Sequence, residues 1–111
     1  MNVNAKFKRI VNDWYVEPAF CVDALMDSVS FDGDMHDPCC GQGNIPKITG
    51  GTGSDLVDRS EGRYPVVDFL KDKTKRENII TNPPYRITVN IVTHALKHVQ
   101  NKIAVIVPLG F

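Results

Sequence analysis

The sequence is short of the features that mark membrane, secreted and strongly charged proteins. Its longest uninterrupted apolar run, Ile103–Val107, is far too short to span a bilayer, and no apolar stretch follows the basic start, so no secretory signal is expected. Only three cysteines occur, two of them adjacent, which does not fit a disulfide framework and favours a reducing, cytoplasmic setting. Acidic and basic residues number 13 each, so net charge does not indicate a nucleic-acid partner.

What is present is an ordinary globular composition in a chain of 111 residues. With 42% apolar and 23% charged residues the chain can bury one modest core, so we expect residues 1–111 to form a single domain. A basic cluster stands at Lys71–Arg76. Such a cluster is compatible with a polyanion partner, but a solvated loop explains it more simply.

Apolar residues at helical spacing predict two helices, over residues 18–29 and 87–99. Pro18 suits the first turn of the earlier helix. Between the two, the glycine-rich run 35–44 is expected to be a turn. Residues 45–49 are expected to form about one helical turn, which the following glycines end.

Short apolar segments predict strands at residues 53–57, 66–70 and 78–81, separated by polar or glycine-containing connections. The β-branched run 102–107 is typical of a strand that is buried on both faces. Because helices and strands alternate along the chain, the sequence favours an α/β layered domain with a largely parallel sheet.

One chemically informative segment is Asp37–Gly43, which reads Asp-Pro-Cys-Cys-Gly-Gln-Gly. Glycines at a strand-to-helix turn let backbone N–H groups come close to a ligand. Asp55, 18 residues after Asp37, stands where an acidic side chain can hold the hydroxyls of a ribose. The pattern predicts a site for a nucleoside-containing cofactor, with a purely structural turn as the alternative. Cys39 and Cys40 lack the spacing of metal ligands, so no metal site is expected.

The sharper segment is Asn82-Pro83-Pro84-Tyr85, which follows a predicted strand. A rigid turn would explain the prolines but not the flanking Asn and Tyr. The prolines fix the backbone, so that the carbonyl of Pro83 and the amide oxygen of Asn82 can converge on one NH₂ group. Tyr85 supplies a flat face for a planar base or amide. The segment therefore predicts a site that holds an amino group on a planar substrate.

Four motifs, taken in order, resemble the amino-methyltransferases that use S-adenosylmethionine. They are Asp37–Gly43, Ser54–Arg59, Val67–Leu70 and Thr81–Tyr85. The chain is most similar to the phage and bacterial DNA adenine-N6 methyltransferases, and the likeness extends from about residue 14 to residue 111. The order and spacing of the four motifs are more specific than any one of them. The resemblance implies a Rossmann-like methyltransferase fold, with a mostly parallel sheet and flanking helices.

The resemblance also implies roles for individual positions. In that family the first motif wraps the methionine part of the cofactor, which here implicates Asp37, Pro38, Cys39, Gly41 and Gly43. Asp55 would bind the ribose hydroxyls, and Leu56 would pack on the adenine ring. Asp68 would bind the exocyclic amine of the cofactor, and Phe69 would stack near its base.

By the same resemblance, the catalytic residues that hold the target amine are Asn82, Pro83, Pro84 and Tyr85. The methyl group would pass directly from the sulfonium to that nitrogen, without a covalent enzyme intermediate, so positioning and electrostatics would supply the catalysis. An adenine in duplex DNA would have to be flipped out of its stack to reach Tyr85.

Three features depart from the family's pattern. The segment before Asp37 is polar and a poor candidate for a buried first strand. Only 11 residues separate Gly43 from Asp55, which is short for a crossover with its helix. The sequence stops at Phe111, before the family's last strands, so we expect the amino-terminal part of a methyltransferase. Its strand at 102–107 would then present an apolar edge, suited to self-association or to a complementing chain.

Other acceptors and a non-catalytic role stay open. Asn-Pro-Pro-Tyr also serves methyltransferases that modify glutamine side chains in protein release factors, and relatives that modify RNA bases. The Cys-Cys-Gly turn and the Ser54–Arg59 segment favour the DNA group. A chain that binds cofactor or a partner subunit without transferring a methyl group is the alternative from a different class.

Overall fold

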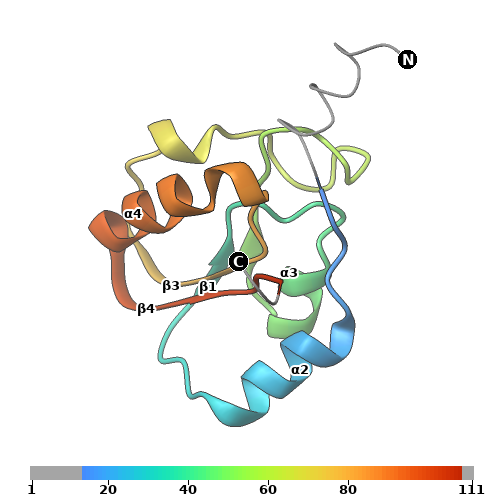
Figure 1. The fold of residues 1–111 in the computed structure, drawn as a ribbon, viewed down its shortest axis with the longest axis vertical. Coiled ribbons are helices and arrows are strands. Elements are labelled where there is room, and N and C mark those ends of the chain that lie inside the picture. Colours follow the sequence, from blue (N-terminus) through green and yellow to red (C-terminus); the bar gives the residue numbers. More distant parts are fainter. Residues whose placement is uncertain (1–13, 109–111) are drawn as a thin grey trace.

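The computed structural model describes residues 14–108, which form an α/β domain built on a parallel sheet (Figure 1). The sheet has four strands in the order β2-β1-β3-β4, and every neighbouring pair is parallel. The strands are β1 (Met35–Asp37), β2 (Thr52–Gly53), β3 (Arg76–Thr81) and β4 (Val99–Val105). The helices are α2 (Ala19–Ser28), α3 (Asn44–Thr49) and α4 (Thr88–His98), with short 3-10 helices η1 (Phe69–Lys71) and η2 (Tyr85–Ile87).

Neighbouring residues of β3 point to opposite faces of the sheet and so define two hydrophobic layers. Ile79 packs in a cluster under α4 and η1, with Phe69, Ile91 and Ala95. Ile80 packs on the other side, under α2 and α3, with Val22 and Ile45. Both isoleucines are fully buried, and each contributes roughly 1.5–3 kcal/mol of transfer free energy. Figure 1 shows α4 on one side of the sheet and α2 with α3 on the other. The predicted α/β class with a parallel sheet is confirmed.

The helices lie close to where their periodicity predicts them. Pro18 occupies the position before α2, so this helix begins at Ala19. Glycines bound α3 on both sides, since Gly43 and Gly50 have positive φ angles of 94° and 74°. Residues other than glycine rarely adopt that conformation, which limits α3 to six residues. This short helix spans the crossover between β1 and β2.

The polar segment before the glycine-rich turn is a strand, so the prediction of a turn over residues 35–44 is wrong at its start. β1 lies between β2 and β3, and both His36 and Asp37 are buried. The ring nitrogens of His36 lie 2.7 Å from Thr52 Oγ1 and 3.2 Å from Ser54 Oγ. Because these hydroxyls satisfy the ring, a histidine can occupy a central strand.

The predicted strands at 53–57 and 66–70 are largely wrong. β2 ends at Gly53, and beyond it only Asp55 and Val66 form an isolated parallel bridge. The second segment bends into η1, because the Asp68 carboxylate accepts a hydrogen bond from the amide of Leu70 at 3.1 Å. Local side-chain capping thus overrides the β propensity of this segment. By contrast, β3 contains the predicted strand 78–81 and extends it at its start.

The last strand is shifted toward the amino terminus relative to the prediction of residues 102–107. β4 covers Val99–Val105, and it is not buried on both faces, since residues 100–102 are exposed and 103–105 are half-buried. Within the described part of the chain β4 has a partner strand on one side only, β3. Its exposure follows from this edge position.

None of the helices within residues 14–108 has both the length and the apolar character that crossing a bilayer requires. The basic start of the chain and the final segment 109–111 lie outside the described residues.

Candidate functional site

The predicted site residues follow the carboxyl ends of neighbouring strands. Asp37 ends β1, Asp55 follows β2, and Asn82 comes directly after β3. In parallel α/β sheets, ligands bind in the crevice at this edge, where the connecting loops diverge. The topology therefore brings together motifs that lie far apart in the sequence.

A largely apolar pocket opens at this edge. Six residues of the predicted cofactor set line it, namely Pro38, Cys39, Asp55, Leu56, Asp68 and Phe69. Pro84 of the Asn-Pro-Pro-Tyr motif lines the same pocket. Leu56 is about half exposed and Phe69 is buried, so the pocket offers apolar surface on which a planar ring can rest. The carboxylates of Asp55 and Asp68 are acceptors beside that surface.

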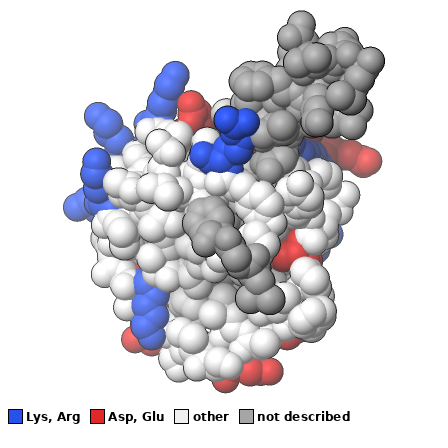
Figure 2. All heavy atoms as spheres, in the orientation of Figure 1, with Lys and Arg blue, Asp and Glu red and all other residues white. Residues whose placement is uncertain are grey.

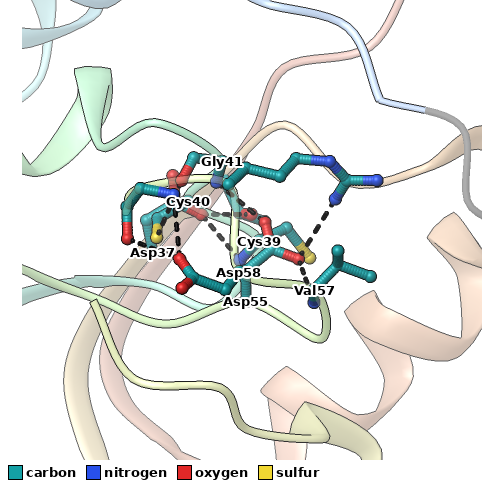
Figure 3. A network of polar contacts seen from close by, with 10 residues as sticks. Asp37, Cys39, Cys40, Gly41, Asp55, Val57 and Asp58 are labelled. Atoms are coloured by element: carbon teal, nitrogen blue, oxygen red, sulfur yellow. Dashed lines mark hydrogen bonds and ion pairs between the residues drawn. The ribbon is translucent and has the colours of Figure 1, made fainter. Parts of the chain in front are cut away.

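The Asp55 carboxylate is the central acceptor of a network that joins two loops (Figure 3). Its Oδ2 accepts a hydrogen bond from the amide of Gly41 at 2.8 Å, and its Oδ1 accepts one from the amide of Val57 at 3.3 Å. The guanidinium of Arg59 lies 3.5 Å from Oδ1. Two carboxylate oxygens offer about four acceptor positions, and these contacts from residues 41, 57 and 59 use three of them.

The glycines of the first motif do not line this pocket. The space where a Cβ of Gly41 would stand is taken by the ring of Trp14, and at Gly43 it is taken by Tyr64. The amide of Gly41 is bonded to Asp55, and the amide of Gly43 donates to the carbonyl of Cys40 at 2.8 Å. Here the glycines allow close approach of the protein's own aromatic rings, and both amides are bonded within the protein.

Asp37 also lies outside the pocket, fully buried beneath the turn that it begins. Its Oδ1 accepts hydrogen bonds from Thr81 Oγ1 at 2.6 Å and from the amide of Cys39 at 2.9 Å. Its Oδ2 has no hydrogen-bond partner among residues 14–108. Burial, with a smaller contribution from the charges of Glu17 and Asp55, raises the pKa of Asp37 to about 7. Asp37 therefore holds the turn in shape.

The adjacent cysteines are poor nucleophiles. Burial raises the pKa of Cys39 well above its usual value and raises the pKa of Cys40 to about 12. Because the thiolate is the reactive form, both side chains act as small packing groups. In the described part of the chain, no three His, Cys, Asp or Glu side chains are grouped to hold a metal ion.

The Asn-Pro-Pro-Tyr turn lies beside Trp14 and Tyr15, two residues to which the sequence motifs assign no function. The ring of Tyr15 stacks on Tyr85, with centroids 5.4 Å apart and an interplanar angle of 28°. A second, small pocket beside this pair is lined by Asn82, Pro83 and Pro84 together with Trp14, Tyr15, Cys39, Asp55 and Arg59. In the sequence, this contact could have been suspected only from the adjacent aromatic residues Trp14 and Tyr15, since the helix that follows them does not require aromatic residues there.

The second proline of the motif orients the start of α4. Its carbonyl accepts hydrogen bonds from Thr88 Oγ1 at 3.0 Å and from the amide of Ile87 at 3.2 Å. The Pro84 carbonyl is therefore used inside the fold, whereas the carbonyl assigned to the target amine is that of Pro83. The turn is a rigid platform between β3 and α4.

Basic side chains are spread over the face drawn in Figure 2, mostly toward its left and upper parts, with uncharged residues between several of them. In the basic cluster 71–76, Lys71, Lys73 and Lys75 are exposed, and Arg76 lies 4.0 Å from Asp72. This cluster has the character of a solvated segment.

Comparison of the chain with protein-family models, with curated proteins and with solved structures finds no match. The inference of function therefore rests on the site itself.

Proposed function

We propose that this chain is a Rossmann-like methyltransferase domain, which transfers a methyl group from S-adenosylmethionine to the N6 amine of adenine in DNA. One observation carries the proposal. Three separate segments of the predicted cofactor set, 38–39, 55–56 and 68–69, line a single pocket, and Pro84 of the predicted catalytic turn lines it too. A chance set of turn and strand motifs has no reason to meet at one cavity.

The chemistry of the pocket fits the adenosine part of this cofactor. Leu56 and Phe69 supply apolar surface for a purine, and the carboxylate of Asp55 supplies an acceptor for ribose hydroxyls. Asp68 stands at the same pocket as an acceptor for an exocyclic amine. When bound, S-adenosylmethionine supplies a methyl group on a sulfonium, an electrophile that none of the protein's own side chains provides.

The chain's own residues would hold the acceptor nitrogen. Asn82 and Pro83 offer two oxygen acceptors for the hydrogens of an NH₂ group, and their small pocket shares Cys39, Asp55 and Pro84 with the cofactor pocket. An amine held by two acceptors has its lone pair turned away from them. Since Cys39 and Cys40 have raised pKa values, transfer through a thiolate intermediate is not favoured.

The test is to incubate the protein with labelled S-adenosylmethionine and unmodified DNA, and to look for labelled N6-methyladenine. RNA and a glutamine-containing peptide serve as parallel acceptors, which distinguish the alternative substrates of the same chemistry. Asn82→Ala should bind cofactor normally and transfer no label, because its contact acts in the transition state. Full transfer by Asn82→Ala would exclude the amine-holding role. Cofactor binding without transfer to any acceptor would favour the non-catalytic alternative.

A further inference from the structure

The segment before α2 reaches across to the catalytic turn and binds one side chain there. Asn82 Nδ2 donates hydrogen bonds to the backbone carbonyl of Tyr15 at 2.8 Å and to the carboxylate of Glu17 at 3.1 Å. The partners are 67 and 65 residues away in sequence. Glu17 is half-buried, so solvent screens its contact with Asn82 only in part.

These contacts settle which way the amide of Asn82 faces. A backbone carbonyl and an ionised carboxylate can only accept hydrogen bonds, so the NH₂ end of the amide has to face them. A flipped amide would place its oxygen against two other acceptors and lose both hydrogen bonds. Because the carboxamide is planar, its oxygen is turned away from Tyr15 and Glu17.

We propose that Glu17 is a positioning residue for methyl transfer, which holds the nitrogen of the Asn82 amide and thereby keeps the amide oxygen presented to the target amine. This role rests on the proposed function. The carbonyl of Tyr15 fixes the amide from a second direction, and the negative charge of Glu17 makes its hydrogen bond the stronger kind. Without Glu17, the amide can rotate and present its own NH₂ to the target NH₂, where two donors oppose each other.

The experiment measures kcat and KM for methyl transfer to DNA in the wild type, Glu17→Ala, Glu17→Gln and Asn82→Ala. Glu17→Ala should lower kcat about tenfold, the effect of losing one charged hydrogen bond, and leave KM for S-adenosylmethionine unchanged. Glu17→Gln should recover most of this loss, because its side-chain oxygen still accepts from Asn82. The matched control is Asp23→Ala, which removes an exposed carboxylate on α2 and should behave as wild type.

An NMR measurement tests the contact independently of turnover. The side-chain NH₂ resonances of Asn82, assigned by their disappearance in Asn82→Ala, should shift in Glu17→Ala and stay in place in Asp23→Ala. Unshifted resonances in Glu17→Ala would overturn the contact and the role built on it.

The kinetic outcomes separate this role from the proposed function. Wild-type kcat in Glu17→Ala, alongside an inactive Asn82→Ala, would overturn the positioning role alone. If Glu17→Ala instead raised KM for S-adenosylmethionine and left kcat unchanged, the positioning role would be overturned as well. A wild-type chain that methylates no DNA would overturn the proposed function, and the positioning role for DNA methylation with it.

Discussion

The carboxylate of Asp55 accepts a hydrogen bond from the backbone amide of Gly41 at 2.8 Å, which ties the turn after β1 to the segment after β2. One buried side chain therefore serves the fold and the candidate cofactor site together. Its substitution should change both stability and ligand binding, and the two effects can be measured separately.

Asp55→Ala should destabilise the fold by about 1–3 kcal/mol, because the buried amide of Gly41 loses its acceptor. It should also abolish the stabilisation that we expect the demethylated cofactor, S-adenosylhomocysteine, to give the wild type by mass action. Thermal denaturation with and without this ligand measures both quantities. Asp27→Ala, an exposed carboxylate on α2, is the control. Equal ligand stabilisation in Asp55→Ala and wild type would remove Asp55 from the site.

His94 should support the candidate cofactor pocket through its contact with Phe69, which lines that pocket. Its Nε2 donates to the carbonyl of Asp72 at 2.6 Å, and its ring packs edge-on against Phe69 with centroids 4.9 Å apart. His94→Ala loosens η1, so cofactor affinity should fall by about 0.5–1.5 kcal/mol, the value of one aromatic pair. Titration calorimetry measures this change. Unchanged affinity in a destabilised His94→Ala protein would limit the residue to a structural role.

Tyr85 should contribute stacking energy to the binding of substrate. Tyr85→Ala should weaken DNA binding by about 1–3 kcal/mol, whereas Tyr85→Phe keeps the ring and should stay near wild type. Fluorescence anisotropy with a labelled oligonucleotide that carries an unpaired adenine measures the difference. Equal affinity of Tyr85→Ala and Tyr85→Phe would show that the ring does not receive the base.

The pH dependence of stability should reveal two buried groups, His36 and Asp37, whose protonation changes stability in opposite directions. Burial lowers the pKa of His36 from 6.5 to about 4, so the unfolded chain binds this proton more tightly and stability falls as pH drops from 6.5 to 4. Burial raises the pKa of Asp37 from 3.8 to about 7, so the folded chain binds this proton more tightly and stability falls as pH rises from 4 to 7. In the wild type the two slopes nearly cancel below pH 6.5.

Asp37→Asn keeps an acceptor for Thr81 and removes one of the two slopes. Relative to wild type, this variant should lose stability on acidification from pH 6.5 to 4, by up to about 1.4 kcal/mol per pH unit. His36→Gln should show the opposite slope, with stability falling toward pH 7. Urea denaturation across this range measures both, and parallel pH profiles for all three proteins would contradict the prediction.

The exposed edge of β4 should promote self-association of the 111-residue polypeptide. Val105 stands in register with Thr81 of β3, and the opposite side of β4 has no strand partner within residues 14–108. Val105→Lys should reduce association by placing a charge at this edge, with some loss of stability. Sedimentation velocity at tens of micromolar, the usual range of such association, measures it. A wild-type chain that stays monomeric at this concentration would show that the edge of β4 is not accessible to a second chain.

Local patterns in the sequence determined those helices and strands whose residue spacing or composition is typical of their secondary structure. The helices α2 and α4 follow from apolar spacing, and β3 follows from a run of residues that favour strands. The approach of the 38–39 and 55–56 segments to one edge also follows from the sequence, because parallel strands bring their carboxyl ends to one edge. The 68–69 segment follows no strand of the sheet, so its place at the same pocket does not follow from this rule.

Only the tertiary structure decided the features that depend on contacts between distant segments. His36 can lie in a central strand because hydroxyls from β2 and the residue after it satisfy its ring. The glycines of the first motif face Trp14 and Tyr64, and Asn82 is oriented by Tyr15 and Glu17. The physical reason is that a polar group's cost of burial depends on partners many residues away, which no local periodicity records.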